Sequence, residues 1–203
     1  SQIRGTPRVV LGSPLIALDL PDPFDAYIFA DESPGSVAAL KARVDRAGHA
    51  SKVSIITGDA NENVTEIAKL IAGPGGGRSL SFCFLDPFKL NVHLETVRKL
   101  ADGRDMDFVI LLALYVYANR NIKSYIRDES PTIDRFLGDR TWRDEWREAE
   151  GEGASIVEYL AKAYSARMAA IGYLPMRLDE MVKIRSHDKR LPLYFLAFFS
   201  RHK

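Results

Sequence analysis

The stretch from Leu80 to Leu90, Leu-Ser-Phe-Cys-Phe-Leu-Asp-Pro-Phe-Lys-Leu, decides the fold of this chain. The apolar run Phe82–Leu85 has the length and aromatic content of a strand buried on both faces, as strands of parallel sheets are. Pro87 has no amide hydrogen and therefore ends the strand, and a helical pattern begins near Asn91. A strand that passes through an acid and a proline into a helix predicts one βα unit of an α/β fold.

Strands and helices are predicted to alternate along the rest of the chain. The predicted strands are 26–30, 52–57, 82–85, 107–114, 175–184 and 193–200. The predicted helices are 13–20, 36–47, one that is capped by Asn61 or Asn63 and runs to about Ala72, 91–103 and 155–171. This alternation implies a doubly wound, mostly parallel α/β sheet of the Rossmann-like type, with helices on both faces. Residues 185–192 join the last two strands into a hairpin, so we expect an antiparallel C-terminal strand.

Residues 115–153 interrupt this alternation. They are aromatic, strongly charged and broken by glycines, and they are predicted to form a helical insertion within a single domain that covers 1–203. The six arginines between 120 and 147 are interleaved with six acids. We therefore expect a paired, solvated face, with nucleic-acid binding as the alternative interpretation.

The composition is that of an ordinary globular protein. The 203 residues, 46% of them hydrophobic, can bury a full core, and the net charge of +1 gives no overall field for a nucleic acid or a membrane. Cys83 is the only cysteine and is expected in the core, which excludes an internal disulfide and fits a reducing cytoplasm. The sequence has neither a signal-peptide pattern nor an apolar stretch of about 18 residues, and its histidines lack metal-ligand spacing. These features predict a cytoplasmic protein with no membrane partner and no metal.

The glycine-rich segment 73–77 resembles a phosphate-binding loop only in composition. A phosphate loop follows a strand and opens a helix, whereas this segment follows a predicted helix and precedes a predicted strand. We therefore interpret it as a linker.

Acids follow three successive predicted strands, at Asp31-Glu32, Asp59-Ala60 and Asp86. The carboxyl ends of parallel strands meet at one edge of a sheet, so these acids are expected to share a crevice. Asp31 or Glu32 suits the ribose hydroxyls of a nucleoside, while Asp59 and the Ala60 amide suit the adenine edge. The alternative is that each Asp forms a turn or caps a helix.

The tripeptide Asp86-Pro87-Phe88 is similar to a motif of enzymes that methylate exocyclic amines. There, an acid or amide side chain and a backbone carbonyl accept hydrogen bonds from the amine while the aromatic ring stacks on the base, which orients the amine toward the methyl donor. We therefore predict a catalytic role for Asp86, Pro87 and Phe88. A strand stop followed by a helix cap explains the same residues equally well.

Several stretches together carry a resemblance to a known family. They are Gly12–Leu18, Phe29–Asp31, Gly58–Asn61, Phe84–Phe88, Asn119-Arg120, and Gly138 followed by Trp142. In this order and spacing the chain resembles the three-Cys-motif partner proteins, a bacterial family similar to class I S-adenosylmethionine-dependent methyltransferases. The resemblance implies a methyltransferase-like sheet and an S-adenosylmethionine site at Asp31, Asp59, Ala60 and Asp86. It also implies association with a radical S-adenosylmethionine-type protein that bears three cysteines.

The chain departs from that family before Gly12. Family members usually begin with a strand and a glycine-rich turn that wraps the methionine part of the donor, and this sequence lacks both. We therefore expect the first strand of the fold to be missing and donor binding to be weak without the turn. Methyltransferase activity is expected if the upstream turn is present. The alternatives are a non-catalytic docking partner of the three-cysteine protein, and a nucleic-acid defence module.

Arg120 and Trp142 are further candidates for substrate binding. Arg120 follows the fifth predicted strand and could bind a phosphate or carboxylate, or form a surface ion pair instead. Trp142 and Trp146 are four residues apart on a predicted helix, where they could stack on a base or pack against the insertion.

Overall fold

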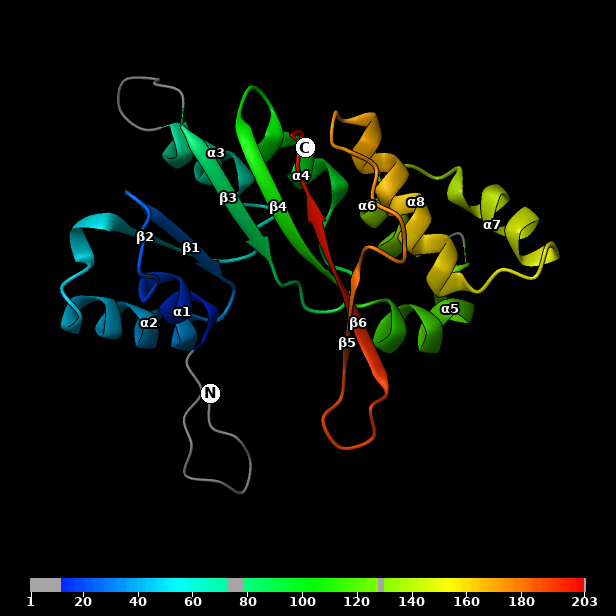
Figure 1. Ribbon diagram of the computed structural model, residues 1–203, viewed down its shortest axis with the longest axis horizontal. Helices are drawn as coiled ribbons and strands as arrows, with labels where there is room; N and C mark the ends of the chain where they lie inside the picture. The colour runs from blue at the N-terminus through cyan, green and yellow to red at the C-terminus, as the bar shows by residue number, and fades with distance from the viewer. Residues whose placement is uncertain (1–11, 73–78, 128–129, 203) are drawn as a thin grey trace. The chain divides into compact units, whose positions relative to one another are not determined.

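The computed structural model describes residues 12–72, 79–127 and 130–202, and the chain divides into two compact units, 1–76 and 77–203 (Figure 1). Unit 1 contains a two-stranded sheet and unit 2 a four-stranded sheet. The predicted α/β class is confirmed, with both parallel and antiparallel strand pairs. The doubly wound arrangement stays a prediction. No helix within the described ranges is long and apolar enough to cross a membrane.

Unit 1 is built on a parallel strand pair. Its elements are α1 (Ser13–Leu18), β1 (Tyr27–Asp31), α2 (Pro34–Arg46), the 3-10 turn η1 (Ala50–Lys52), β2 (Val53–Thr57) and α3 (Val64–Ala72). β1 and β2 pair in register from Tyr27↔Val53 to Asp31↔Thr57, which confirms the predicted parallel pairing. Leu18, Tyr27 and Val44 form one buried cluster of this unit, and Ile56, Val64 and Ile67 are buried as well.

Helix α2 begins earlier than the sequence indicates. The predicted start is Ser36, but the helix begins at Pro34, because Ser33 is the N-cap and its hydroxyl accepts a hydrogen bond of 3.3 Å from the Ser36 amide. Proline at the first helical position loses no hydrogen bond there. The cap brings the helix to within three residues of the end of β1.

Unit 2 is a four-stranded mixed sheet with a layer of helices. Its elements are β3 (Leu80–Leu85), α4 (Leu94–Ala101), β4 (Asp105–Leu112), the π-helix η2 (Leu114–Ala118), α5 (Asn119–Tyr125), α6 (Thr132–Leu137), α7 (Trp142–Gly151), α8 (Ile156–Ala170), β5 (Val182–Arg185) and β6 (Pro192–Phe199). The strand order is β3-β4-β6-β5, with β3 parallel to β4 and β6 antiparallel to both of its neighbours. The predicted antiparallel C-terminal strand is confirmed.

The strand predicted at 175–184 is wrong over most of its length, since β5 covers only Val182–Arg185. Ser165 of α8 holds the preceding segment, because its hydroxyl lies 2.8 Å from the amide and 2.7 Å from the carbonyl oxygen of Met176. Arg177 then donates its amide hydrogen to the Glu180 carboxylate, at 2.7 Å, in a local turn. The backbone groups of this segment therefore bond locally rather than in a sheet ladder.

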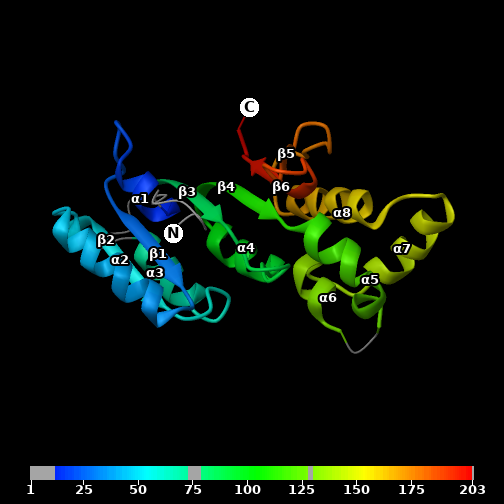
Figure 2. The ribbon, with the colours of Figure 1, turned by 90° about the horizontal axis from the view of Figure 1, so that it is seen from below.

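Helices cover one face of this sheet. Along β4, the alternate side chains Met106, Phe108, Ile110 and Leu112 are buried. Cys83 lies beside Phe108 in the register, and burial raises the pKa of its thiol to about 12. Figure 2 shows α4 and α6 on the same side of this sheet. Tyr164 of α8 links the layers, with its ring stacked on Phe136 of α6 at 4.6 Å and 6.0 Å from Phe199 of β6.

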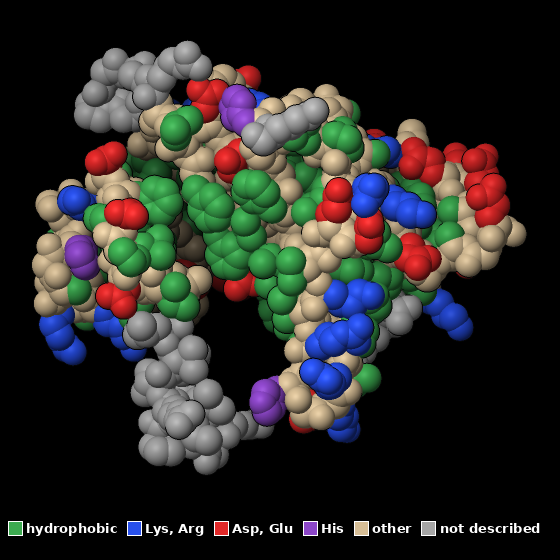
Figure 3. All heavy atoms as spheres, in the orientation of Figure 1, with side chains coloured by type: hydrophobic (Ala, Val, Ile, Leu, Met, Phe, Trp, Pro, Cys, Tyr) green, Lys and Arg blue, Asp and Glu red, His purple; other side chains and the backbone are tan. Residues whose placement is uncertain are grey.

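The opposite face of the sheet exposes apolar side chains, contrary to the expectation that Phe82–Leu85 is buried on both faces. Phe82 and Phe84 are 51% and 42% exposed, and Phe198 shares their face through its pairing with Val109. Figure 3 shows apolar side chains gathered over β3 and β4. These side chains are exposed because β3 is an edge strand of a sheet that carries its helices on one face.

Candidate functional site

The two acids of unit 1 lie at the same edge of the parallel pair. Asp31 ends β1 beside Thr57, the last residue of β2, and the Gly58 amide donates a hydrogen bond of 3.0 Å to the Asp31 carbonyl oxygen. Asp59 is therefore the second residue beyond the strand that pairs with Asp31. For these two acids, the predicted position at one sheet edge is confirmed.

Each of these carboxylates also shapes the turn that follows it. Asp31 Oδ1 accepts a hydrogen bond of 2.8 Å from the Ser33 amide, and Asp59 Oδ1 accepts 2.7 and 2.8 Å bonds from the backbone amide and the side chain of Asn61. A carboxylate has about four acceptor positions on two oxygens, so a turn bond through Oδ1 is compatible with binding a ligand. The role of these carboxylates in forming turns therefore does not exclude a role in binding a ligand.

Gly58 is the residue that allows the second turn. Its φ is 123°, and an added Cβ would lie 2.7 Å from Nδ2 of Asn63. Only glycine adopts this conformation readily, so the sequence fixes a sharp bend directly before Asp59. The Ala60 amide in the bend donates to no acceptor in the described part of the chain, and Glu32 is exposed at the end of β1.

In unit 2, the predicted tripeptide lies in a strained turn after β3. Asp86 is exposed, Phe88 is 66% exposed, and Lys89 has a positive φ of 62°. The left-handed conformation costs a non-glycine residue about 1–2 kcal/mol. The Lys89 ammonium lies 5.3 Å from the centre of the Phe88 ring. Strain of this kind clusters at functional sites, which favours a role for this turn beyond ending the strand.

A π-helix faces the same turn from the end of the next strand. η2 begins two residues after β4, and its Tyr117 ring lies edge-to-face with Phe88, with the ring centres 5.8 Å apart. Single π-turns are frequent at functional sites because they re-aim side chains. The sequence predicts helix from residue 115, but helical periodicity over five residues does not distinguish a π-turn from an α-turn. No pattern in the sequence therefore identifies Tyr117 as a residue of this turn.

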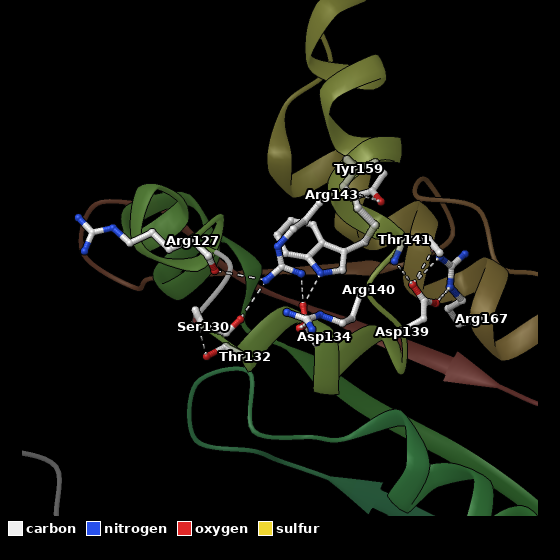
Figure 4. A network of polar contacts seen from close by, with 11 residues as sticks. Arg127, Ser130, Thr132, Asp134, Asp139, Arg140, Thr141, Arg143, Tyr159 and Arg167 are labelled. Carbon is white, nitrogen blue, oxygen red and sulfur yellow. Dashed lines mark hydrogen bonds and ion pairs between the residues drawn. The ribbon is translucent and has the colours of Figure 1, made fainter.

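Trp142 is a core residue of the helical layer, next in the chain to Arg143, whose pair with Asp134 is drawn in Figure 4. It is fully buried, its indole N–H donates to Asp134 at 2.8 Å, and the Arg143 guanidinium lies 4.6 Å from its ring centre. Arg143 also pairs with Asp134 and donates to the carbonyl oxygens of Arg127 and Ser130, at 3.3 and 3.2 Å. The structure thus favours the packing interpretation of Trp142, and the proposed site does not include it.

A second polar cluster joins α7, α8 and the turn before α7. Arg167 donates to Asp139 at 2.8 Å and to Glu145 at 2.9 Å, and the Tyr159 hydroxyl lies 3.0 Å from Glu145. Partial burial tends to raise the pKa of both acids, but hydrogen bonds from Arg167 and Thr141 outweigh it and lower the pKa of each. Partial burial and the Glu145 carboxylate raise the pKa of Tyr159. These groups hold α8 against α7 and the turn before it.

The remaining predictions concern Arg120 and the meeting of all three acids. The backbone of Arg120 lies in α5, but its side chain is outside the described residues. The structure brings Asp31, Glu32, Asp59 and Ala60 together in unit 1, and Asp86, Pro87 and Phe88 together in unit 2. A crevice shared by the two sets stays a prediction.

No protein-family model matches this chain, and no curated protein is significantly similar to it.

Proposed function

We propose that this protein binds S-adenosylmethionine and transfers its methyl group to an exocyclic amine. The observation that carries the proposal is the pair of carboxylates, Asp31 and Asp59, at one edge of the parallel strands of unit 1. Ligands of open parallel sheets bind at this edge, and acids there suit the hydroxyls and amino group of a nucleoside.

The groups in unit 1 fit an adenosine moiety. Asp31, with the exposed Glu32 beside it, supplies acceptors for the two ribose hydroxyls. Asp59 supplies an acceptor for the adenine amino group, and the Ala60 amide, with no acceptor of its own in the described part of the chain, supplies a donor for a ring nitrogen. When bound, the cofactor would supply an electrophilic methyl group.

The turn at Asp86-Pro87-Phe88 supports the second half of the proposal. An amine that donates its hydrogens to the Asp86 carboxylate and to a backbone carbonyl keeps its lone pair free for the new nitrogen–carbon bond. The exposed Phe88 ring, held by Tyr117 at 5.8 Å, offers a stacking surface for a planar acceptor. S-adenosylmethionine would supply the methyl group and leave as its thioether product, and Asp86 or water would accept the proton that the amine nitrogen loses.

Isothermal titration of the whole protein with S-adenosylmethionine tests the proposal. Asp31→Asn and Asp59→Asn should each weaken binding about tenfold or more, because each removes a charge-assisted hydrogen bond worth about 1.5–3 kcal/mol. Asp45→Asn is the matched control, since Asp45 is exposed on α2, away from this edge. Absence of binding by the wild-type protein, or equal binding by all three variants, would overturn the proposal.

A second candidate function is a non-catalytic docking partner of a radical S-adenosylmethionine-type protein that bears three cysteines. The exposed apolar face of unit 2 favours it, because Phe82, Phe84 and Phe198 offer a surface that a protein partner could cover. Co-purification with such a protein that is lost in Phe82→Ser/Phe84→Ser, combined with no cofactor binding, would favour this function over methyl transfer.

A further inference from the structure

The hairpin between β5 and β6 carries a concentrated positive charge that the net charge of the chain conceals. Between residues 183 and 190 there are four cations and one acid, Asp188. The cations are Lys183, Arg185, Lys189 and Arg190, and all are exposed. In the described part of the chain, none of the four forms an ion pair with a carboxylate. Figure 3 shows the Lys and Arg side chains gathered along this hairpin.

Local hydrogen bonds hold the hairpin in a defined shape. The Ser186 amide donates to the Leu191 carbonyl oxygen at 2.8 Å, and the Arg190 amide donates to the Ser186 carbonyl oxygen at 3.1 Å. Arg185 donates through Nη1 to the Arg190 carbonyl oxygen at 3.1 Å, and Arg190 has a positive φ of 52°. Lys183 and Arg185 are therefore presented on β5, and Lys189 and Arg190 on a hydrogen-bonded turn, which lowers the entropy cost of binding an anion.

The topology places this turn beyond the carboxyl ends of β3 and β4. Phe195 of β6 pairs with Leu112 at the end of β4, and β6 begins three residues earlier, at Pro192. At a rise of about 3.4 Å per residue, the turn projects roughly 10 Å past the end of β4. Figure 1 shows it projecting from the end of the sheet toward which β3 and β4 run.

Aromatic rings lie at the same end of unit 2. Phe88 and Tyr117 follow the ends of β3 and β4, and the Phe88 ring is 66% exposed. Tyr115 of the π-helix η2 contacts the hairpin strands. Its ring centre lies 5.3 Å from that of Phe195 in β6 and 5.6 Å from the Lys183 ammonium in β5. An exposed ring and a row of cations without a carboxylate partner, at one end of this unit, match the two requirements of single-stranded nucleic-acid binding, stacking and phosphate neutralisation.

We propose that the β5–β6 hairpin binds the phosphate backbone of a single-stranded nucleic acid while Phe88 stacks on one of its bases. The proposal does not depend on methyl transfer or on cofactor binding. It favours a nucleic acid over an anionic membrane, because the hairpin turn offers a single exposed apolar side chain, Leu191, for insertion into lipid.

The proposal is tested by measuring the affinity of the protein for a fluorescently labelled, single-stranded oligonucleotide of about 12 nucleotides. The measurement uses fluorescence anisotropy in about 50 to 200 mM salt. The variant with Lys183, Arg185, Lys189 and Arg190 changed to Gln should bind at least tenfold more weakly at low salt. For this variant, the slope of log K against log salt should be smaller in magnitude by up to about 3, because each phosphate contact contributes about 0.7 to the slope.

Two further variants make the result specific. The matched control changes four other cations of unit 2, Arg98, Lys99, Arg147 and Lys162, to Gln, and it should bind like the wild type. Phe88→Ala should lower affinity for the single strand about tenfold while leaving the salt dependence unchanged, because stacking involves no counterion release. Circular dichroism spectra like that of the wild type show that each variant is folded.

Other outcomes would overturn the proposal. They are an equal loss in the control and hairpin variants, binding of heparin as tight as binding of the single strand with no effect of Phe88→Ala, and binding to phosphatidylserine vesicles without binding to the oligonucleotide. The first would indicate a non-specific charge effect, the second a general polyanion surface, and the third a membrane surface.

Discussion

Lys89 directly follows Phe88, whose ring is exposed, and its backbone is strained. Its φ of 62° lies in the left-handed region, which costs free energy for a residue that has a Cβ atom. A turn with Gly at this position would reach the same shape without that cost. Glycine would therefore suit this backbone better than Lys89, whose ammonium lies 5.3 Å from the Phe88 ring centre.

Lys89→Gly should raise the free energy of unfolding by up to about 1 kcal/mol, because it relieves the left-handed strain. Urea unfolding measures the change. Lys99→Gly, in helix α4, is the matched control and should lower the free energy of unfolding by about 1 kcal/mol. A Lys89→Gly protein that is less stable than the wild type would show that the turn is held by the side chain rather than strained by it.

At the scale of elements, Arg167 is the cation that ties α8 to α7 and to the turn before it. It contacts Asp139 and Glu145, and the pKa values of both acids lie below their ordinary values of 3.8 and 4.5. An acid with a lowered folded-state pKa contributes stability above its unfolded pKa and loses it as the pH falls through the folded value. This contribution is therefore complete near pH 7 and decreases below about pH 4.5.

Arg167→Gln should lower the free energy of unfolding by about 1–2 kcal/mol at pH 7, because two partly buried acids lose their cation while keeping some contact with water. Urea unfolding between pH 7 and pH 3 should show this difference shrinking as the acids become protonated. Arg177→Gln removes an exposed pair with Asp179 and should leave the stability unchanged. A difference that stays constant down to pH 3 would mean that Arg167 acts through packing rather than charge.

Local sequence signals predicted the elements well and the exposure of their faces poorly. Short apolar runs in the sequence located β1, β2, β4 and β6, because a strand that is buried in a sheet consists of such a run. The exposure of Phe82 and Phe84 depends on which elements cover the sheet, a tertiary property that no short window contains.

The candidate site divides in the same way. Asp31 and Asp59 were predictable from strand ends, since parallel pairing brings those ends together. The π-helix and the contact of Tyr117 with Phe88 were not, because a π-turn differs from an α-turn by one residue in its hydrogen bonds. The hairpin charge was visible in the sequence, but its position beside the aromatic edge follows only from the antiparallel pairing of β6 with β4.

At the scale of the whole molecule, the two units differ in the size of their cores. Unit 1 has a two-stranded sheet and few buried apolar side chains, whereas unit 2 has four strands and a layer of helices. The buried apolar side chains of unit 1 are Leu18, Tyr27, Val44, Ile56, Val64 and Ile67. Two-stranded sheets are marginally stable in water, and small units bury a smaller fraction of their surface. Both tryptophans, Trp142 and Trp146, are buried in unit 2.

Urea unfolding of the whole protein should therefore give different midpoints by two probes. Far-ultraviolet circular dichroism reports on both units and should begin to change at a lower urea concentration than tryptophan fluorescence, which reports on unit 2. A fragment of residues 79–203 is the control and should show the same midpoint by both probes. Coincident transitions in the whole protein would mean that the two units unfold as one.

The position of β6 has a consequence for biosynthesis. Among the described strands, β6 comes last in chain order, yet it lies between β4 and β5 inside the sheet and supplies the buried Phe195, Ala197 and Phe199. While the nascent chain is still on the ribosome, β4 and β5 have no partner between them until residues 192–199 emerge. The exposed apolar strands of unit 2 would be open to chaperones throughout that interval, and a premature stop codon before Pro192 would leave a polypeptide that cannot complete its sheet.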